Sequence, residues 1–144
     1  MGASVQTRVS AYGVAVEDGR LLLARLSDAS PIFTPGLWHL PGGGIDPGEQ
    51  PAAALARELL EETGLELTAA RLLDARTYAV ERGGTSWHLT ALFYAVELAA
   101  GAPAVTETDG STDAARWIPL AGLDPALLSP AAADALALLG PGQS

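Results

Sequence analysis

The first part of the chain alternates between short apolar runs and turn residues. Residues 8–16 alternate loosely and are rich in β-forming residues, which predicts a strand. Asp18-Gly19 is a strong two-residue hairpin signal, so we expect Arg20–Leu26 to return as the partner strand. Residues 27–37 contain two prolines and a glycine and predict a loop.

A glycine-rich segment and a helix come next. Trp38–Leu40 predicts a short strand, and residues 41–48, with four glycines and two prolines, predict a sharply turning loop. Pro51 suits the first turn of a helix, and Ala52–Glu62 are nearly all good helix formers. Gly64 follows as the expected C-terminal cap.

This helix has two chemically different faces. Since each residue advances about 100° around the axis, one face collects small and apolar residues and should be buried. Its members are Ala52, Leu55, Ala56 and Leu59. We expect a second face, roughly 120° away by the same arithmetic, to carry three carboxylates at spacings i, i+3 and i+4. These are Glu58, Glu61 and Glu62.

The second half of the chain predicts further strands and one more helix. Residues 71–81 and 85–98 are expected as strands joined by a turn at Arg82-Gly83-Gly84. A polar loop over residues 99–115 and a short strand over 116–119 follow, and the apolar run 130–139 predicts a helix. The element order predicts an α+β fold, an α/β/α sandwich with a mixed β-sheet between helices. With 144 residues, we expect a single domain over residues 1–144.

Charge and composition exclude several classes of partner. The net charge is −9 and all eight basic residues are arginines, so binding to a nucleic-acid polymer is not expected. No run of 18 apolar residues exists, so no membrane span is expected. The first six residues do not resemble a secretory signal, which makes the cytoplasm the default location. The chain has no cysteine, which excludes disulfides and thiolate metal sites.

The three helix glutamates break two local rules together. Like charges at this spacing destabilise a helix, and the macrodipole disfavours negative charge at its C-terminal end. A solvated charged face is the ordinary interpretation of such a run. A functional interpretation is a site for a hard divalent cation, because Mg²⁺ prefers carboxylate oxygens and keeps waters that a phosphate can replace.

The residues upstream of the glutamates decide between these interpretations. Residues 43–65 read Gly43, five residues, Glu49, seven residues, then Arg57-Glu58-Leu59-Leu60-Glu61-Glu62-Thr63-Gly64-Leu65. This segment resembles the Nudix box of the Nudix hydrolases, and every specified position of that motif agrees. The flanking strand order is also similar to the sandwich of that family.

The resemblance implies a metal-dependent hydrolase of nucleoside diphosphate derivatives. It implies Mg²⁺, with Mn²⁺ as the alternative, held by Glu58, Glu61, Glu62 and the backbone carbonyl of Gly42. It also implies that Glu49 and Arg57 form a pair that braces the loop against the helix. Braced pairs of this kind are common around metals, and an ordinary structural ion pair is the alternative.

The resemblance leaves the general base open. A carboxylate must accept a proton as water attacks phosphorus. We expect Glu58 as the base, with Glu61 as the second candidate. Some family members use a carboxylate of a later loop, and here Glu107, Asp109 and Asp113 lie in such a loop, as candidates for a metal ligand or base. Each of these three is otherwise interpreted as solvated surface.

The resemblance implies a small nucleotide as the substrate, and we expect its exact class by elimination. Family members that cleave ADP-ribose typically carry a proline shortly after the box. No proline lies between Pro51 and Pro103 here, which argues against that class. What remains resembles the MutT-type enzymes, which convert nucleoside triphosphates, including oxidised ones, to the monophosphate and pyrophosphate. Trp38, Arg57 and His88 are candidates for contact with the substrate. Anchoring of the loop is the alternative for Trp38, and a structural role is the alternative for His88.

Two alternatives stay open, and a third is excluded. The chain could act on a dinucleoside polyphosphate or a nucleotide sugar instead. It could also be a Nudix-fold sensor that binds a nucleotide without cutting it, although such modules usually lose box carboxylates. An isoprenoid-diphosphate isomerase of the same fold would need a catalytic cysteine, which is absent. Many relatives are dimers, so the resemblance is compatible with a homodimer.

Overall fold

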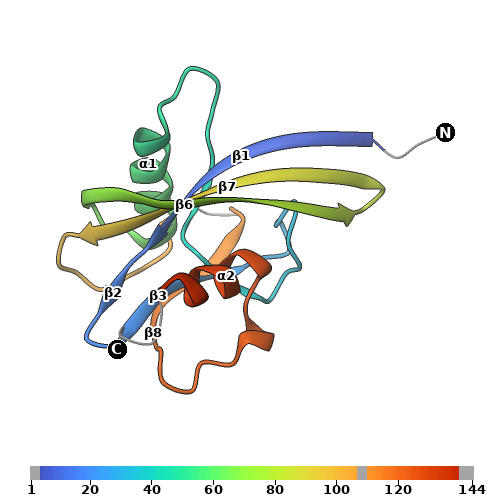
Figure 1. The fold of residues 1–144 in the computed structure, drawn as a ribbon. Coiled ribbons are helices and arrows are strands. Elements are labelled where there is room, and N and C mark those ends of the chain that lie inside the picture. Colours follow the sequence, from blue (N-terminus) through green and yellow to red (C-terminus); the bar gives the residue numbers. More distant parts are fainter. Residues whose placement is uncertain (1–3, 107–109, 140–144) are drawn as a thin grey trace.

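The fold is built around a mixed four-stranded sheet with a helix on each side. The computed structural model describes residues 4–106 and 110–139. The main sheet has the order β5-β1-β7-β6, with bounds Gly42–Gly44, Ser4–Val14, Thr85–Leu98 and Leu67–Arg82. Strands β1 and β7 are parallel, whereas the β1–β5 and β6–β7 pairs are antiparallel. Figure 1 shows helix α1 on one side of this sheet and helix α2 on the other.

A second, smaller sheet is antiparallel. Its order is β2-β3-β4, with bounds Val16–Glu17, Arg20–Leu26 and Trp38–His39, and β8 (Thr112–Pro119) pairs with β3. The β2–β3 hairpin turns at Asp18 and Gly19, whose φ values of 50° and 72° are those of the tight turn that this dipeptide predicts. The predicted α+β sandwich is confirmed, but its strands divide between two sheets rather than one.

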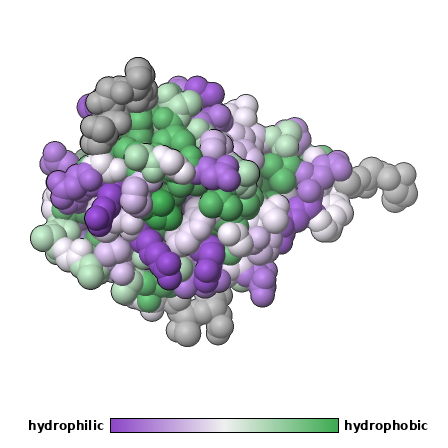
Figure 2. Space-filling model, turned by 90° about the horizontal axis from the view of Figure 1, so that it is seen from below, coloured by the Kyte–Doolittle hydropathy of each residue, from purple (hydrophilic) through white to green (hydrophobic). Residues whose placement is uncertain are grey.

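The two helices pack through different side chains. Helix α1 (Pro51–Thr63) buries Leu55 and Leu59 against Ala11 of the main sheet. Helix α2 (Pro130–Leu139) packs three buried alanines into the larger core, which also contains Phe93 of β7. A short 3-10 turn, η1 (Pro125–Leu127), precedes α2. The view from the α2 side in Figure 2 shows hydrophobic surface between hydrophilic side chains.

Several predicted boundaries move in the structure. Strand β1 begins at Ser4 and β6 at Leu67, because each is extended by its ladder with β7. Strand β8 begins at Thr112, inside the segment predicted as a loop, since its pairing with β3 outweighs the polar sequence. Helix α1 begins at the predicted Pro51, and Gly64 caps it in the left-handed conformation with φ 72°.

The buried face of α1 differs from the predicted one. Ala52 is exposed and Ala54 is fully buried. Glu62, predicted on the polar face, is only 3% exposed. The reason is geometric, since Glu62 lies seven residues after Leu55, about two helical turns on, and therefore shares its direction. One of the three glutamates is thus drawn inward, towards the sheet.

No helix of the described residues is long and apolar enough to cross a membrane.

Candidate active site

Three glycines bring the chain close to helix α1. The segment predicted as a loop forms strand β5 at the edge of the main sheet, paired with β1. Gly42 has φ 139°, and a Cβ there would lie 2.1 Å from the carbonyl oxygen of Ala11. A Cβ at Gly43 would lie 2.8 Å from the carboxyl carbon of Glu58. Glycine is therefore required at Gly42, where the obstacle is backbone, whereas at Gly43 the Glu58 carboxylate lies in the space that a side chain would fill.

Arg57 connects the loop and the helix. Its Nε and Nη2 donate to the two carboxylate oxygens of Glu49, each at 2.9 Å. Nη2 also donates to the carbonyl oxygen of Gly44 at 3.1 Å. Nη1 donates to Glu58 Oε1 at 2.9 Å and lies 3.6 Å from Glu61 Oε1. The two-point contact with Glu49 fixes the guanidinium plane, and that plane in turn positions Glu58.

This network changes the acidity of its members. The side-chain hydrogen bond from Arg57 lowers the pKa of Glu49 from 4.5 to about 2, helped by the backbone N–H of Asp46. The same hydrogen bond with Glu49 raises the pKa of Arg57 above its ordinary value. The loop therefore stays ion-paired across the whole neutral range.

We predict a stability difference with a defined pH window for Glu49→Gln. Because the folded pKa of Glu49 is lowered, its contribution to stability is present above the unfolded pKa near 4.5 and is lost as the pH falls through about 2. Chemical denaturation of both proteins should show the unaltered one as more stable at pH 7. That difference should shrink between about pH 4.5 and pH 2. A difference that is constant over this window would contradict the assignment of the pair.

Glu62 lies beside the start of strand β5. The backbone N–H of Gly42 donates to Glu62 Oε2 at 3.4 Å. This contact places the buried carboxylate next to the glycine whose carbonyl is expected to complete the cation site. Glu58 and Glu61 lie on the same end of the helix, with side chains 16% and 36% exposed. The predicted carboxylates thus lie on one helix end beside β5.

The donor set fits a hard divalent cation in its chemistry. The three glutamates and the Gly42 carbonyl offer only oxygen, which is what Mg²⁺ takes. Gly43 lets the Glu58 carboxylate lie against the backbone of β5. The carboxylate and the Gly42 carbonyl can then bind the same cation. As the side chains stand, no group of three or more His, Asp or Glu residues within 4–106 and 110–139 is gathered closely enough to hold a metal ion.

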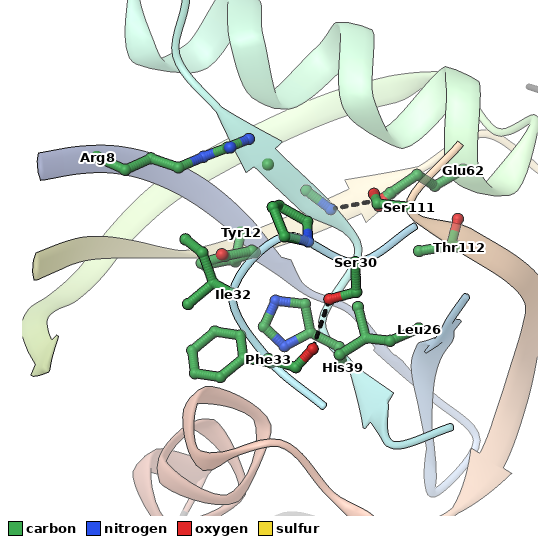
Figure 3. Close-up of a pocket in the computed structure, with 13 residues that line it drawn as sticks. Arg8, Tyr12, Leu26, Ser30, Ile32, Phe33, His39, Glu62, Ser111 and Thr112 are labelled. Atoms are coloured by element: carbon green, nitrogen blue, oxygen red, sulfur yellow. Dashed lines mark hydrogen bonds between the residues drawn. The ribbon is translucent and has the colours of Figure 1, made fainter. Parts of the chain in front are cut away.

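A hollow opens next to Glu62 (Figure 3). Strands β1, β4 and β5, the start of β8 and the end of α1 contribute residues to its rim and walls. The segment that follows β3 contributes others. The lining residues used below are Arg8, Tyr12, Phe33, His39 and Glu62. Arg8 and Tyr12 belong to no motif of the sequence. The only available signal was the alternation of residues 8–16, which places Arg8 and Tyr12 on the same face of the strand.

Aromatic rings form the inner part of this hollow. The ring of His39 lies edge-on to Tyr12, with centroids 4.7 Å apart, and 5.1 Å from Phe33. Burial lowers the pKa of His39 to about 3, so its imidazole is neutral at pH 7. Burial also raises the pKa of Tyr12 to about 12. The hollow is therefore lined by uncharged rings, with a carboxylate at its edge.

His39 is held from behind by helix α2. Its Nδ1 lies 2.5 Å from Ser129 Oγ, and that hydroxyl accepts from the backbone N–H of Ala132 at the start of α2. The imidazole orientation is thus tied to the helix N-terminus.

The other predicted substrate contacts lie elsewhere. Trp38 packs against the larger core, its ring is 5.9 Å from the Arg25 guanidinium, and it does not line the hollow. These surroundings agree with the alternative that Trp38 anchors the loop. His88 is exposed on β7, between Thr7 of β1 and Ala79 of β6, and does not line the hollow either.

Of the three loop carboxylates, only Asp113 falls in the described part. It lies on β8, and its Oδ1 accepts from Arg25 Nε at 2.7 Å in an exposed ion pair. Its neighbour Thr112 lines the hollow, and alternation along the strand directs Asp113 to the opposite side. Glu107 and Asp109 lie outside the described residues.

Comparison with known proteins places this architecture in context. The family model described as NUDIX domain matches residues 5–139. The nucleoside triphosphatase NudI of Escherichia coli O1:K1 / APEC is 48% identical over 50 residues, which is 35% of this chain and 35% of NudI. The match thus spans about a third of that relative.

Solved structures agree along nearly the whole chain. The crystal structure of a MutT NUDIX hydrolase from Burkholderia pseudomallei is 32% identical, with a TM-score of 0.76, over 93% of this chain and 98% of the other. A MutT protein from Methanosarcina mazei Go1 shares the fold, with a TM-score of 0.72 and 23% identity over 91% of each chain.

Proposed function

The chain belongs to the Nudix hydrolase family, and from that premise we propose that it hydrolyses a nucleoside triphosphate to the monophosphate and pyrophosphate. Water supplies one oxygen to phosphorus, the bond to the bridging oxygen breaks, and the proton of water passes to a carboxylate. A divalent cation, when bound, would screen the phosphate charge and lower the pKa of the attacking water. Glu58, Glu61, Glu62 and the Gly42 carbonyl would hold it.

The observation that carries this proposal is the Arg57 network. One guanidinium binds the loop through Glu49 and positions Glu58 at 2.9 Å, so loop and helix form one rigid unit. A carboxylate held in this way is preorganised to accept a proton in a fixed direction. This favours Glu58 as the base, with Glu61, 3.6 Å from the same guanidinium, as the second candidate.

The choice of a nucleoside triphosphate has two supports. The similar proteins NudI and MutT are a nucleoside triphosphatase and a Nudix hydrolase by their names. The hollow beside Glu62 is lined by the rings of Tyr12, Phe33 and His39, which suit a base, while a cation held at the carboxylate end would attract the phosphates. Asp113 is disfavoured as the base, because alternation along β8 directs its side chain away from the hollow that Thr112 lines.

A substrate panel tests this proposal against its alternatives. Purified protein is incubated with Mg²⁺ or Mn²⁺ and with ordinary and oxidised nucleoside triphosphates, a dinucleoside polyphosphate and a nucleotide sugar. We expect the triphosphates to be cut fastest, with the monophosphate identified by anion-exchange chromatography. If a nucleotide conjugate is cut fastest, that conjugate replaces the nucleoside triphosphate as the proposed substrate. No turnover of any compound, together with nucleotide binding, would favour the sensor.

A further inference from the structure

One arginine on the rim of the hollow has no role in the proposed chemistry. Arg8 is half-buried on β1, on the same face of the strand as Tyr12. Figure 3 shows its side chain extending along the rim towards strand β5. None of the hydrogen bonds or ion pairs between described residues involves Arg8.

The backbone beside Arg8 is shaped to admit its guanidinium. A Cβ at Gly44 would lie 2.6 Å from Arg8 Nη2, 2.9 Å from Nε and 3.0 Å from Cζ. Gly44 does not have a positive φ, so its conformation does not itself demand glycine. The guanidinium of Arg8 thus lies in the space that a side chain at Gly44 would occupy, at the edge of β5.

The charges around the hollow point to an anionic ligand for this arginine. Arg57, a nearby cation on helix α1, is engaged by Glu49 and Glu58 and cannot turn to a ligand without breaking those bonds. Arg8 is the one arginine among the described residues that lines the hollow. A guanidinium with unused donors pairs best with phosphate or carboxylate oxygens.

We propose that Arg8 binds the phosphate chain of the nucleotide at the mouth of the hollow. This inference rests on the proposed function, which supplies a nucleoside polyphosphate as the ligand. The positive charge of Arg8 then attracts the phosphates, which the glutamates of α1 would otherwise repel. It acts as a fixed cation on the strand side, opposite the glutamates of α1.

The test is the binding of inorganic pyrophosphate in the presence of Mg²⁺, measured by calorimetry. Arg8→Ala is expected to weaken binding about 10- to 100-fold, as befits the loss of a charge-assisted contact. Arg8→Lys should recover part of the loss, since it keeps the charge but not the planar fork. In turnover assays, Arg8→Ala should raise KM by a similar factor with little change in kcat, because the contact is present before and during the reaction.

Two further variants separate a specific contact from a general effect. Arg20→Ala removes one exposed positive charge away from the hollow and should bind pyrophosphate as the unaltered protein does. Gly44→Ala should displace the guanidinium and weaken binding while Arg8 is still present. Combined with Arg8→Ala it should cost little more than Arg8→Ala alone.

The outcomes are distinct. Equal losses in Arg8→Ala and Arg20→Ala, no loss in Arg8→Ala, or no binding of pyrophosphate by the unaltered protein would overturn the inference. Loss confined to Arg8→Ala, in a protein that cuts no nucleotide, would leave it standing and overturn the proposed function instead.

Discussion

Glu62→Gln is expected to lower Mg²⁺-dependent nucleotide hydrolysis by about three orders of magnitude while the protein stays folded. A cation site provides several kcal/mol of charge stabilisation in the transition state, and each 1.36 kcal/mol is a factor of ten in rate. The neutral amide would remove one of the three charges that attract the cation. Its oxygen can still accept from the backbone N–H of Gly42, so the local structure should persist.

Thermal unfolding shows whether Glu62→Gln loses activity without losing its fold. Glu62 is 3% exposed and shares a helix end with Glu58 and Glu61, so removing its charge relieves repulsion and desolvation. The midpoint of thermal unfolding should therefore stay unchanged or rise. Glu66→Gln, which removes a charge from an exposed glutamate just beyond the helix, should keep full activity. Full activity of Glu62→Gln would reject the metal-site assignment.

Arg57→Ala is expected to damage both activity and stability. The variant leaves Glu49 and Glu58 without the guanidinium that joins them and frees the loop from the helix. Loss of partners that orient metal-binding groups typically costs about 10- to 100-fold in activity. Loss of charge-assisted hydrogen bonds in a half-buried site costs about 1–3 kcal/mol of stability. Arg57→Lys should rescue little, because an ammonium cannot reproduce the two-point contact.

A surface arginine provides the comparison for Arg57. Arg76 pairs with Asp74 on strand β6, and these side chains are 44% and 39% exposed. Arg76→Ala should cost less than about 1 kcal/mol, because exposed pairs are screened by solvent. Urea denaturation and initial rates of both variants measure the contrast. If the two substitutions proved equally mild, Arg57 would be an ordinary surface residue.

The first hairpin and the ends of helix α1 could be predicted from the sequence, because residues within each element determine its backbone conformation. Asp18-Gly19 forms its hairpin, and Pro51 and Gly64 mark the ends of helix α1. In each case a single residue type provides a backbone angle or a missing N–H that the element needs. The helix glutamates were likewise placed on α1 by spacing alone.

Strand β5 could not be read in this way. Three consecutive glycines have low strand propensity and predict a loop. They form a strand because Gly42 and Gly43 must pass close to Ala11 and Glu58, contacts that come from distant parts of the chain. The same limit explains why Arg8 was missed, since its neighbour Gly44 lies 36 residues away in the sequence.

Trp38 is a second residue whose surroundings depend on distant contacts. Substrate contact and anchoring of the loop were both open for it; the neighbouring His39 lines the hollow, and Trp38 packs on the core beside Arg25. Side chains of adjacent strand residues point to opposite faces, so one of the two had to turn away. Only the pairing of β4 with β3 decides which one.

The central claim is that the helix carboxylates direct hydrolysis at one bond of a nucleoside triphosphate, and product analysis tests it most directly. The protein is incubated with a nucleoside triphosphate and Mg²⁺, and all phosphorus-containing products are resolved by ³¹P NMR. We expect monophosphate and pyrophosphate in equal amounts, no diphosphate, and no reaction when a chelator removes the cation. Release of orthophosphate with the diphosphate, or turnover unaffected by the chelator, would contradict it.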